Sequence, residues 1–182
     1  VKGFSELKDF LTSLASPKVV MMLVPAGKIV DDVINDLTPL LSKGDIIIDG
    51  GNSHFTDTTK RVEKLEAIGL HFFGMGVSGG EEGARRGPSM MPGGDTKAYQ
   101  YMQPVFEKIA AKVNGDPCVA YIGPGASGHF VKMVHNGIEY ALMQLVADTY
   151  EIMKNSLQLG NEEIQKIFAD WNNGRLKSYL LE

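Results

Sequence analysis

Five polar side chains recur at helical spacing in one stretch of the sequence and could together carry out proton transfer. They are Lys132, His135, Asn136, Glu139 and Tyr140. At 100° per residue these positions fall within an arc of roughly 140° on one face of a helix. A lysine shielded from water can act as a base near neutral pH, and a shielded glutamate can keep its proton and act as an acid. The stripe therefore predicts acid–base chemistry on an oxygenated substrate, with a solvated helix face that has no function as the alternative.

A long, uninterrupted helix is needed to hold these five positions on one face. Between residues 127 and about 157 only two glycines disfavour a helix, which predicts one helix of roughly 30 residues, about 45 Å long at 1.5 Å per residue. The side opposite the polar stripe is apolar and is the side that we expect to pack; it consists of Val134, Ile138, Ala141 and Leu145. A helix of that length extends past one small sheet, so it is predicted to enter a second, all-α domain.

The sequence before the long helix alternates between helical and strand patterns. Strands are predicted at residues 18–24, 45–49, 70–77, 88–94 and 119–122, and helices at residues 5–14, 27–40, 57–68 and 96–112. This alternation predicts an α/β fold: a partial doubly wound, Rossmann-like sheet of parallel strands with helices on both faces. We place this sheet domain at residues 1–125. The long helix and the start of the all-α domain occupy residues 126–182, with further helices predicted at residues 161–171 and 175–181.

Two details of the sheet domain are predicted from local composition. The continuous apolar run at residues 18–24 predicts a strand that is buried on both faces. Asn52 and Ser53 come shortly before the predicted helix at residues 57–68, and we expect them to cap it.

Two glycine-rich turns follow predicted strands, at residues 49–53 and 77–80. In doubly wound sheets the carboxyl ends of the strands are where ligands bind. Paired glycines such as Gly79 and Gly80 let backbone N–H groups surround an anion, with simple tight strand–helix turns as the alternative. Neither turn is the dinucleotide fingerprint G-x-G-x-x-G, which this sequence lacks.

Composition limits the partners of the protein. The 182 residues include 18 Lys and Arg against 22 Asp and Glu, a formal net charge of −4. This weakly acidic composition does not indicate a surface that binds nucleic acid or an anionic membrane. No run of about 18 apolar residues is present, so no membrane span is predicted. The single cysteine, Cys118, is expected to be a partly buried, inert thiol, which suits a reducing compartment such as the cytoplasm. His54, His71 and His129 are expected at the surface or in turns without metal-ligand spacing, so no metal is predicted.

Three longer motifs resemble one known family. They are residues 45–53 (DIIIDGGNS), residues 76–94 (GVSGGEEGARRGPSMMPGG) and residues 128–140 (GHFVKMVHNGIEY). In order and separation they resemble the decarboxylating 6-phosphogluconate dehydrogenases, within the wider β-hydroxyacid dehydrogenase superfamily. Only the 6-phosphogluconate branch looks like His-Asn-Gly-Ile-Glu-Tyr shortly after the lysine, so the resemblance is specific, and it covers nearly the whole chain.

The resemblance implies oxidation of 6-phosphogluconate at C3 with NADP, loss of C1 as CO2 and release of ribulose 5-phosphate. It implies that Lys132 takes the C3 hydroxyl proton and that Glu139 protonates the carbon of the resulting enediol. The implied substrate contacts are Ser78, Gly79 and Gly80 to the carboxylate, Asn52, His135 and Asn136 to hydroxyls, and Tyr140 to the phosphate. The implied cofactor contacts are Val24, Pro25, Ala26 and Asn52. NAD stays open as the cofactor, because the family's glycine fingerprint and selectivity residues are absent from this sequence.

Both ends of the sequence are abrupt. The first residue is Val1 rather than Met, and Glu182 ends the sequence within a helical pattern. We therefore expect a chain that is cut at both ends and inactive by itself, from a cytoplasmic enzyme that, by the resemblance, forms a homodimer. Two alternatives remain open: a related β-hydroxyacid dehydrogenase that acts on a smaller acid, and a non-catalytic domain fragment that only binds a ligand or a partner.

Overall fold

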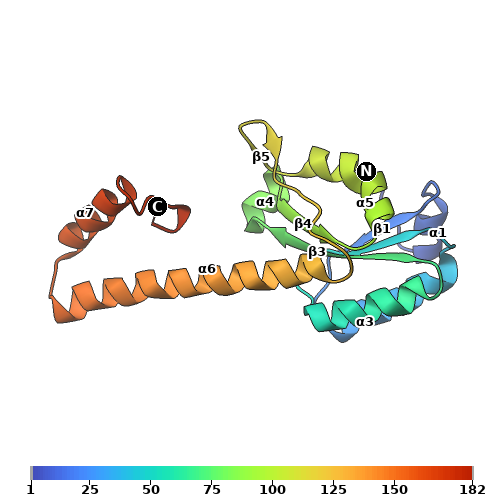
Figure 1. Ribbon diagram of the computed structural model, residues 1–182, viewed down its shortest axis with the longest axis horizontal. Coiled ribbons are helices and arrows are strands. Elements are labelled where there is room, and N and C mark those ends of the chain that lie inside the picture. The colour runs from blue at the N-terminus through green and yellow to red at the C-terminus, as the bar shows by residue number, and fades with distance from the viewer. Residues whose placement is uncertain (1, 182) are drawn as a thin grey trace. The chain divides into compact units, whose positions relative to one another are not determined.

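The structure, a computed structural model, describes residues 2–181. The chain divides into two compact units, Val1–Met133 and Val134–Glu182. The boundary between them falls inside the long helix α6 (Ser127–Glu151). Figure 1 labels the main elements of both units. The expected helix end at Glu182 lies outside the described residues.

The first unit contains a four-stranded sheet surrounded by helices (Figure 1). The strands are β1 (Val19–Met22), β2 (Ile46–Asp49), β3 (His71–Ser78) and β4 (Ser89–Gly93). The helical elements are α1 (Leu7–Thr12), α2 (Lys28–Leu37), the 3-10 turn η1 (Thr38–Leu40), α3 (Phe55–Glu66), α4 (Gly80–Arg86) and α5 (Thr96–Ile109). A small hairpin of β5 (Lys112–Val113) and β6 (Asp116–Pro117) follows α5, and the sequence patterns do not predict it.

The strands of this sheet have the order β1-β2-β3-β4. β1, β2 and β3 are parallel, with Ile46 of β2 opposite both Val19 of β1 and His71 of β3. The predicted α/β fold with a partial doubly wound sheet is therefore confirmed. β4 is antiparallel to β3, with Ser89 opposite Ser78, so the prediction of parallel strands is wrong for β4. Parallel strands need a crossover of about a dozen or more residues, and only the short turn with α4 separates β3 from β4.

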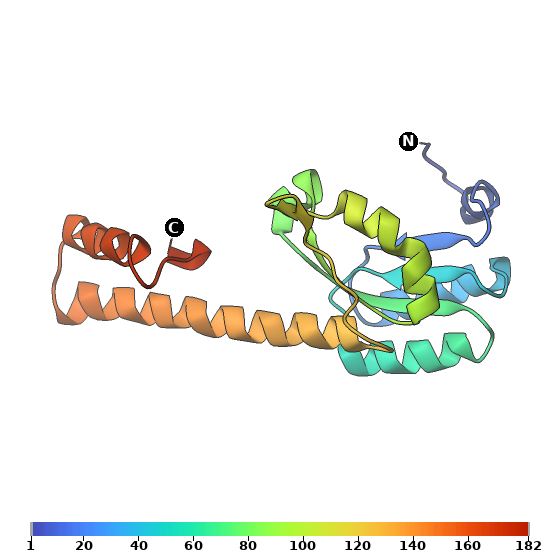
Figure 2. The ribbon, with the colours of Figure 1, turned by 45° about the horizontal axis from the view of Figure 1, so that its top comes forward.

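Helices cover both faces of the sheet and bury two separate apolar clusters. α2 and α3 lie on one face and α5 on the other, as Figure 1 and Figure 2 show. Side chains alternate along β2, because Ile47 belongs to the cluster with α2 and α3, whereas Ile46 and Ile48 belong to the cluster with α5. All three isoleucines are at most 2% exposed. β2 is therefore the central buried strand that its sequence predicts.

Strand β1 is less buried than its apolar sequence predicts. Val20 and Met22 are buried in the cluster with α2, but Met21 is 39% exposed and Leu23, directly after the strand, is 70% exposed. The prediction that residues 18–24 are buried on both faces is therefore wrong. β1 lies at the edge of the described sheet, and an edge strand has one neighbouring strand fewer to cover its side chains.

The predicted strand at residues 119–122 runs beside β4 without forming a continuous ladder. In the described residues the two segments share two isolated parallel bridges, Met90 with Val119 and Gly93 with Gly123. Three steps along β4 (90 to 93) therefore correspond to four steps along the other segment (119 to 123). One residue is left unpaired, as in a β-bulge. The strand prediction is wrong, and this extra residue is the reason.

The second unit continues α6 and adds shorter elements. α6 passes into a π-helical turn, η2 (Ile152–Ser156), and then come α7 (Asn161–Asn172) and the 3-10 turn η3 (Tyr179–Leu181). The predicted long helix and the predicted helix at residues 161–171 are confirmed. The prediction of a helix at residues 175–181 is wrong: the Ser178 backbone N–H donates to the Asn172 side-chain oxygen over 3.1 Å, which holds the chain in a turn.

The apolar side of α6 does not pack as predicted. Val134, Ile138 and Leu145 are 42%, 59% and 62% exposed. The described part of the second unit contains only η2, α7 and η3 besides α6, which is too little chain to cover a helix of this length. Despite this apolar surface, none of the helices within residues 2–181 has the combination of length and hydropathy that a membrane crossing requires.

Candidate active site

Lys132 lies near the start of α6, where the helix rests on strand β3. Only 8% of the residue is exposed. Its Cβ lies so close to the backbone of Gly76 that a methyl group added to this glycine would be 2.6 Å away. Shielding from water is one requirement for a lysine that acts as a base. Lys132 is therefore shielded and lies against the strand that leads into the 77–80 turn, and its role as a base stays a prediction.

His129, one helical turn before Lys132 on α6, is also buried, with 2% of the residue exposed. Its Nδ1 shares a hydrogen bond of 2.7 Å with the hydroxyl of Thr58 on α3, while its Nε2 has no hydrogen-bond partner among the described residues. Burial lowers the pKa of the imidazole below its ordinary value. The prediction of a surface histidine is wrong because α6 presses this residue onto the sheet. Its spacing of three from Lys132 puts both on one side of the helix, and that signal could have revealed it.

We expect the buried His129 to make the protein lose stability as the pH falls below about 6.5, the ordinary pKa of histidine. Because the pKa in the folded state is lower, the unfolded chain takes up a proton in this range that the folded chain does not. The free energy of unfolding is therefore complete above pH 6.5 and decreases as the pH falls toward the folded-state pKa. In the His129→Gln variant, the midpoint of urea unfolding should fall less between pH 7.5 and pH 5.5 than in the wild type.

A matched control for this experiment is His54→Asn. His54 is exposed at the N-cap of α3, and asparagine is also a good capping residue. This variant should keep the pH dependence of the wild type. An equal pH dependence in wild type and His129→Gln would contradict the assignment to His129.

A buried ionic network holds the turn at residues 49–53. Asp49 is fully buried and accepts hydrogen bonds from the Ser53 hydroxyl over 2.5 Å and from the Gly51 backbone N–H over 3.0 Å. Arg61 of α3, 5% exposed, donates to the Ser53 hydroxyl over 3.2 Å and to Asp31 of α2 over 2.7 Å. The hydrogen bond from Arg61 lowers the pKa of Asp31. The sequence patterns single out neither Arg61 nor its network, because its partners come from two other segments, the start of α2 and the turn at residues 49–53.

This network changes the expected cap of α3. The Ser53 hydroxyl donates its hydrogen bond to Asp49 rather than to the helix. The N-cap of α3 is His54, whose ring accepts a hydrogen bond from the Thr56 backbone N–H over 3.4 Å. The prediction that Asn52 and Ser53 cap this helix is therefore wrong. Asn52 instead remains exposed at the tip of the turn, where its amide is available to a ligand.

The turns at residues 49–53 and 77–80 line one open cavity of about 740 Å³. Asn52, Ser78 and Gly80 all border it, so the structure brings these three predicted contacts together. Gly79 borders a neighbouring hollow on the other side of α4 together with Ser78. Gly79 and Gly80 have φ of 134° and 54°, values that favour glycine and turn the backbone sharply into α4.

Two arginines of α4, at positions 85 and 86, also line this cavity. Arg85 pairs with Glu81 over 2.8 Å and Arg86 with Glu82 over 3.0 Å. All four side chains are more than half exposed, so these pairs contribute little to stability. Both arginines are therefore exposed at the rim of the cavity and held by carboxylates of their own helix.

The predicted cofactor contacts lie at the carboxyl edge of the same sheet. Val24 is half-buried, and Pro25 and Ala26 are exposed directly after β1. A methyl group on Gly51 would lie 2.9 Å from the Val24 carbonyl oxygen, so this segment and the turn with Asn52 are in contact. The arrangement fits one side of a dinucleotide site, because doubly wound sheets bind dinucleotides at this edge. The glycine fingerprint that completes such a site is not among the residues of this sequence.

The remaining residues of the stripe continue along α6 in the second unit. His135 Nδ1 lies 3.3 Å from the Asn136 side-chain oxygen and 3.7 Å from Glu139 Oε2. The Glu139 side chain is 38% exposed and Tyr140 is 68% exposed. These groups are therefore accessible to a ligand, on the same continuous helix as Lys132.

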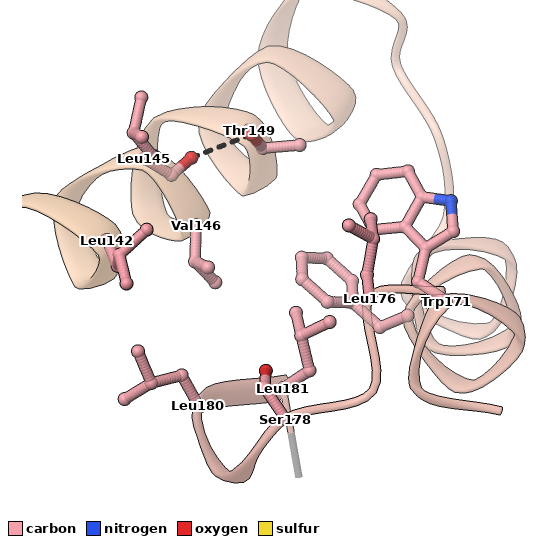
Figure 3. A pocket seen from close by; sticks show the side chains of 10 residues that line it. Leu142, Leu145, Val146, Thr149, Trp171, Leu176, Ser178, Leu180 and Leu181 are labelled. Carbon is pink, nitrogen blue, oxygen red and sulfur yellow. Dashed lines mark hydrogen bonds between the residues drawn. The ribbon is translucent and has the colours of Figure 1, made fainter. Parts of the chain in front are cut away.

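A second hollow, of about 220 Å³, lies within the second unit (Figure 3). Val146 and Leu142 of α6 face Leu181 and Trp171 across it, and Phe168 and Trp171 of α7 pack with their ring centroids 5.4 Å apart. None of the described residues that line this hollow carries a titratable side chain. It therefore cannot supply an acid and a base. Lys132 and Glu139 are not among the residues that line the first cavity either. The first cavity is the better candidate because Asn52, Ser78 and Gly80 border it.

Comparison with known proteins shows which family the chain resembles. Residues 1–123 match the NAD binding domain of 6-phosphogluconate dehydrogenase, and residues 128–182 match the C-terminal domain of 6-phosphogluconate dehydrogenase. The chain is 56% identical to a decarboxylating 6-phosphogluconate dehydrogenase of Bacillus licheniformis, over 100% of this chain and 39% of that protein. It is 54% identical to an NAD(+)-dependent decarboxylating 6-phosphogluconate dehydrogenase of Bacillus subtilis, over 98% of this chain and 38% of that protein.

A solved structure of a 6-phosphogluconate dehydrogenase is also similar to this chain. The 6-phosphogluconate dehydrogenase of Plasmodium falciparum, studied in its apo form and in complexes with NADP+ and with 6-phosphogluconate, superimposes with a TM-score of 0.94. The sequence identity is 45%, over 99% of this chain and 38% of that one. This chain thus spans about two fifths of the length of the relatives it matches. It belongs to the 6-phosphogluconate dehydrogenase family.

Proposed function

We propose that this chain is part of a longer enzyme that converts 6-phosphogluconate to ribulose 5-phosphate and CO2. The observation that carries the proposal is the position of Lys132, a residue that is 8% exposed, whose side-chain stem lies against β3 and which is on the same helix as Glu139. The residues of both family matches support it. A base and an acid on one helix are what an oxidation followed by a decarboxylation requires.

In this reaction the two side chains handle different protons. When bound, the nicotinamide cofactor supplies the hydride acceptor. Lys132 takes the proton from the C3 hydroxyl while the hydrogen on C3 leaves as hydride, which gives a ketone at C3. The C1–C2 bond of this β-keto acid then breaks and CO2 leaves. The electron pair of the broken bond forms the C2–C3 double bond of an enediol, whose C3 oxygen receives the proton back from Lys132. Glu139 then protonates C2 while Lys132 takes the proton of the C3 hydroxyl again, which gives the ketose. General acid–base steps of this kind contribute about 100-fold or more to a rate.

The other predicted residues are proposed to bind and orient the substrate. Backbone N–H groups at Gly79 and Gly80, with the Ser78 hydroxyl, are suited to the carboxylate because paired glycines leave N–H groups free to surround an anion. The side chains of Asn52, His135 and Asn136 are proposed to bind the hydroxyl groups of the substrate, and Tyr140 is proposed to bind its phosphate. The shared cavity of Asn52, Ser78 and Gly80 and the exposure of Tyr140 support these roles.

NADP is the proposed cofactor, held in part by the segment 24–26 and by Asn52. The Plasmodium relative was studied with NADP+, whereas a Bacillus subtilis relative is named NAD(+)-dependent. Both cofactors therefore occur among the relatives, and the selectivity of this protein has to be measured.

The proposed active form is a homodimer of the full-length protein in the cytoplasm. The family resemblance supports the dimer, and a single, half-buried cysteine, Cys118, suits a reducing compartment. The 182-residue chain is proposed to be inactive by itself, because it holds only one side of the cofactor site.

Turnover by the full-length protein tests the proposal. With 6-phosphogluconate and NADP we expect release of CO2 and ribulose 5-phosphate together with reduced cofactor. Activity only on a three- or four-carbon hydroxy acid would instead assign the protein to a related β-hydroxyacid dehydrogenase. The coding sequence upstream of Val1 gives a second check: we expect a strand followed by G-x-G/A-x-x-G, and its absence would favour a non-catalytic domain.

A further inference from the structure

Glycines make up much of the surface on which the start of α6 rests. Gly74 and Gly76 lie on the same face of β3, because side-chain positions alternate along a strand. A Cβ on Gly128 of α6 would collide with the carbonyl oxygens of Gly74 and Met91. The helix backbone therefore lies directly on the strand backbones, closer than any side chain would permit.

Gly76 is the glycine that faces the lysine. A Cβ at this position would lie 2.6 Å from Lys132 Cβ, 3.1 Å from Lys132 Cγ and 3.2 Å from the Gly128 carbonyl oxygen. Gly76 is not among the glycines with positive φ, so its backbone conformation is one that alanine adopts without strain. The obstacle to a side chain at position 76 is therefore steric, and it comes from Lys132 and its helix.

A buried hydrogen bond fixes the same turn of α6 from the other side. His129 Nδ1 and the Thr58 hydroxyl lie 2.7 Å apart, and both residues are almost completely buried. His129 directly follows Gly128 and comes one helical turn before Lys132. We call Gly76, Gly128 and the His129–Thr58 bond together the lysine seat.

We propose that the lysine seat is a positioning device for the catalytic amine, in which Gly76 sets the depth of Lys132 and the His129–Thr58 bond sets the rotation of its helix. The proposal rests on the proposed function only in that Lys132 is the base. None of these residues needs to touch the substrate. They act through Lys132, by fixing where its side chain leaves the helix.

The expected effect follows from the size of the clash. Carbon atoms pack at about 3.5–4.0 Å, so a methyl group at position 76 must move Lys132 or its helix by roughly 1 Å. A displacement of about 1 Å at a reacting group can reduce a rate by about 100-fold. The proposed contacts of Asn52, Ser78, Gly79 and Gly80 lie outside α6. Because these contacts do not move with the helix, binding should change less than turnover.

The test uses the full-length protein with Gly76→Ala. We expect kcat with 6-phosphogluconate to fall by about 100-fold, while KM changes less than about threefold. Leu65→Ala is the matched control, because Leu65 is fully buried in the cluster with α2 and α3 and its loss destabilises the unit without touching Lys132. This control should have a lower unfolding midpoint and a normal kcat. A normal kcat in Gly76→Ala, or an equal loss of kcat in both variants, overturns the proposal.

Thr58→Val is a milder variant for the case in which Gly76→Ala does not fold. It keeps the shape of Thr58 and removes both hydrogen bonds of its hydroxyl, the one with His129 Nδ1 over 2.7 Å and the longer one to the His54 carbonyl oxygen over 3.3 Å. We expect kcat to fall by several-fold with little change in KM, and an unchanged kcat overturns the rotational part of the proposal.

A crystal structure of Gly76→Ala separates this inference from the proposed function. A displaced Lys132 supports the seat even if the Lys132→Met variant keeps its turnover, in which case the proposed function fails alone. An undisplaced Lys132 overturns the seat, whatever reaction the enzyme catalyses.

Discussion

Replacing Lys132 with methionine in the full-length protein is expected to reduce turnover of 6-phosphogluconate by at least about 100-fold. Methionine has a similar length and fits a buried site, with 8% exposure in the native residue, but it cannot accept a proton. The C3 hydroxyl then has no base at the moment of oxidation. Substrate affinity, measured by calorimetry, should weaken less than turnover, because the proposed contacts to the carboxylate and the phosphate belong to other residues.

Lys97→Met is the control for this substitution. Lys97 is exposed on α5, on the face of the sheet that carries no predicted site residue. Its replacement should leave kcat and KM unchanged. Near-normal turnover by Lys132→Met would remove Lys132 from the mechanism.

Replacing Glu139 with glutamine is expected to reduce steady-state turnover by at least about 100-fold, but at a different step. Without the acid, oxidation and loss of CO2 can still take place once, and the enediol then waits for a proton. Rapid mixing should therefore show a burst of reduced cofactor of about one equivalent per active site, followed by slow turnover. The Lys132→Met variant should show no burst, because its defect precedes oxidation.

The control for this second substitution is Glu162→Gln. Glu162 is exposed in the first turn of α7 and has no proposed role, so its kinetics should match those of the wild type. If Glu139→Gln lacks the burst, the proposal that Glu139 acts only after oxidation is wrong, although both residues would still be needed for turnover.

The features that the sequence predicts best are those set by local spacing. α6, α3 and the residue stripe from Lys132 to Tyr140 follow from helical periodicity, which depends on neighbours three and four positions away. The orientation of β4 does not follow from its own residues, because it depends on how short the connection through α4 is. The exposure of Met21 depends on the position of β1 at the edge of the described sheet, which the strand's apolar composition does not encode.

The sequence predicts which residues of the candidate site could do chemistry, but it does not predict which residues hold them in place. Lys132, Glu139 and the 77–80 turn stand out by residue type and spacing. The burial of His129 and the partners of Arg61 depend on contacts between segments far apart in the chain. A glycine such as Gly76 looks like any other strand glycine until the structure shows Lys132 against it.

A crystal structure of the full-length protein with 6-phosphogluconate bound is the most direct measurement of the mechanism. We expect Lys132 Nζ within hydrogen-bond distance of the C3 hydroxyl, about 2.6–3.2 Å, and the Glu139 carboxyl group within reach of C2 of the same molecule. Side chains of Lys132 and Glu139 that point away from the sugar acid, or that are separated from it by packed hydrocarbon, would contradict it.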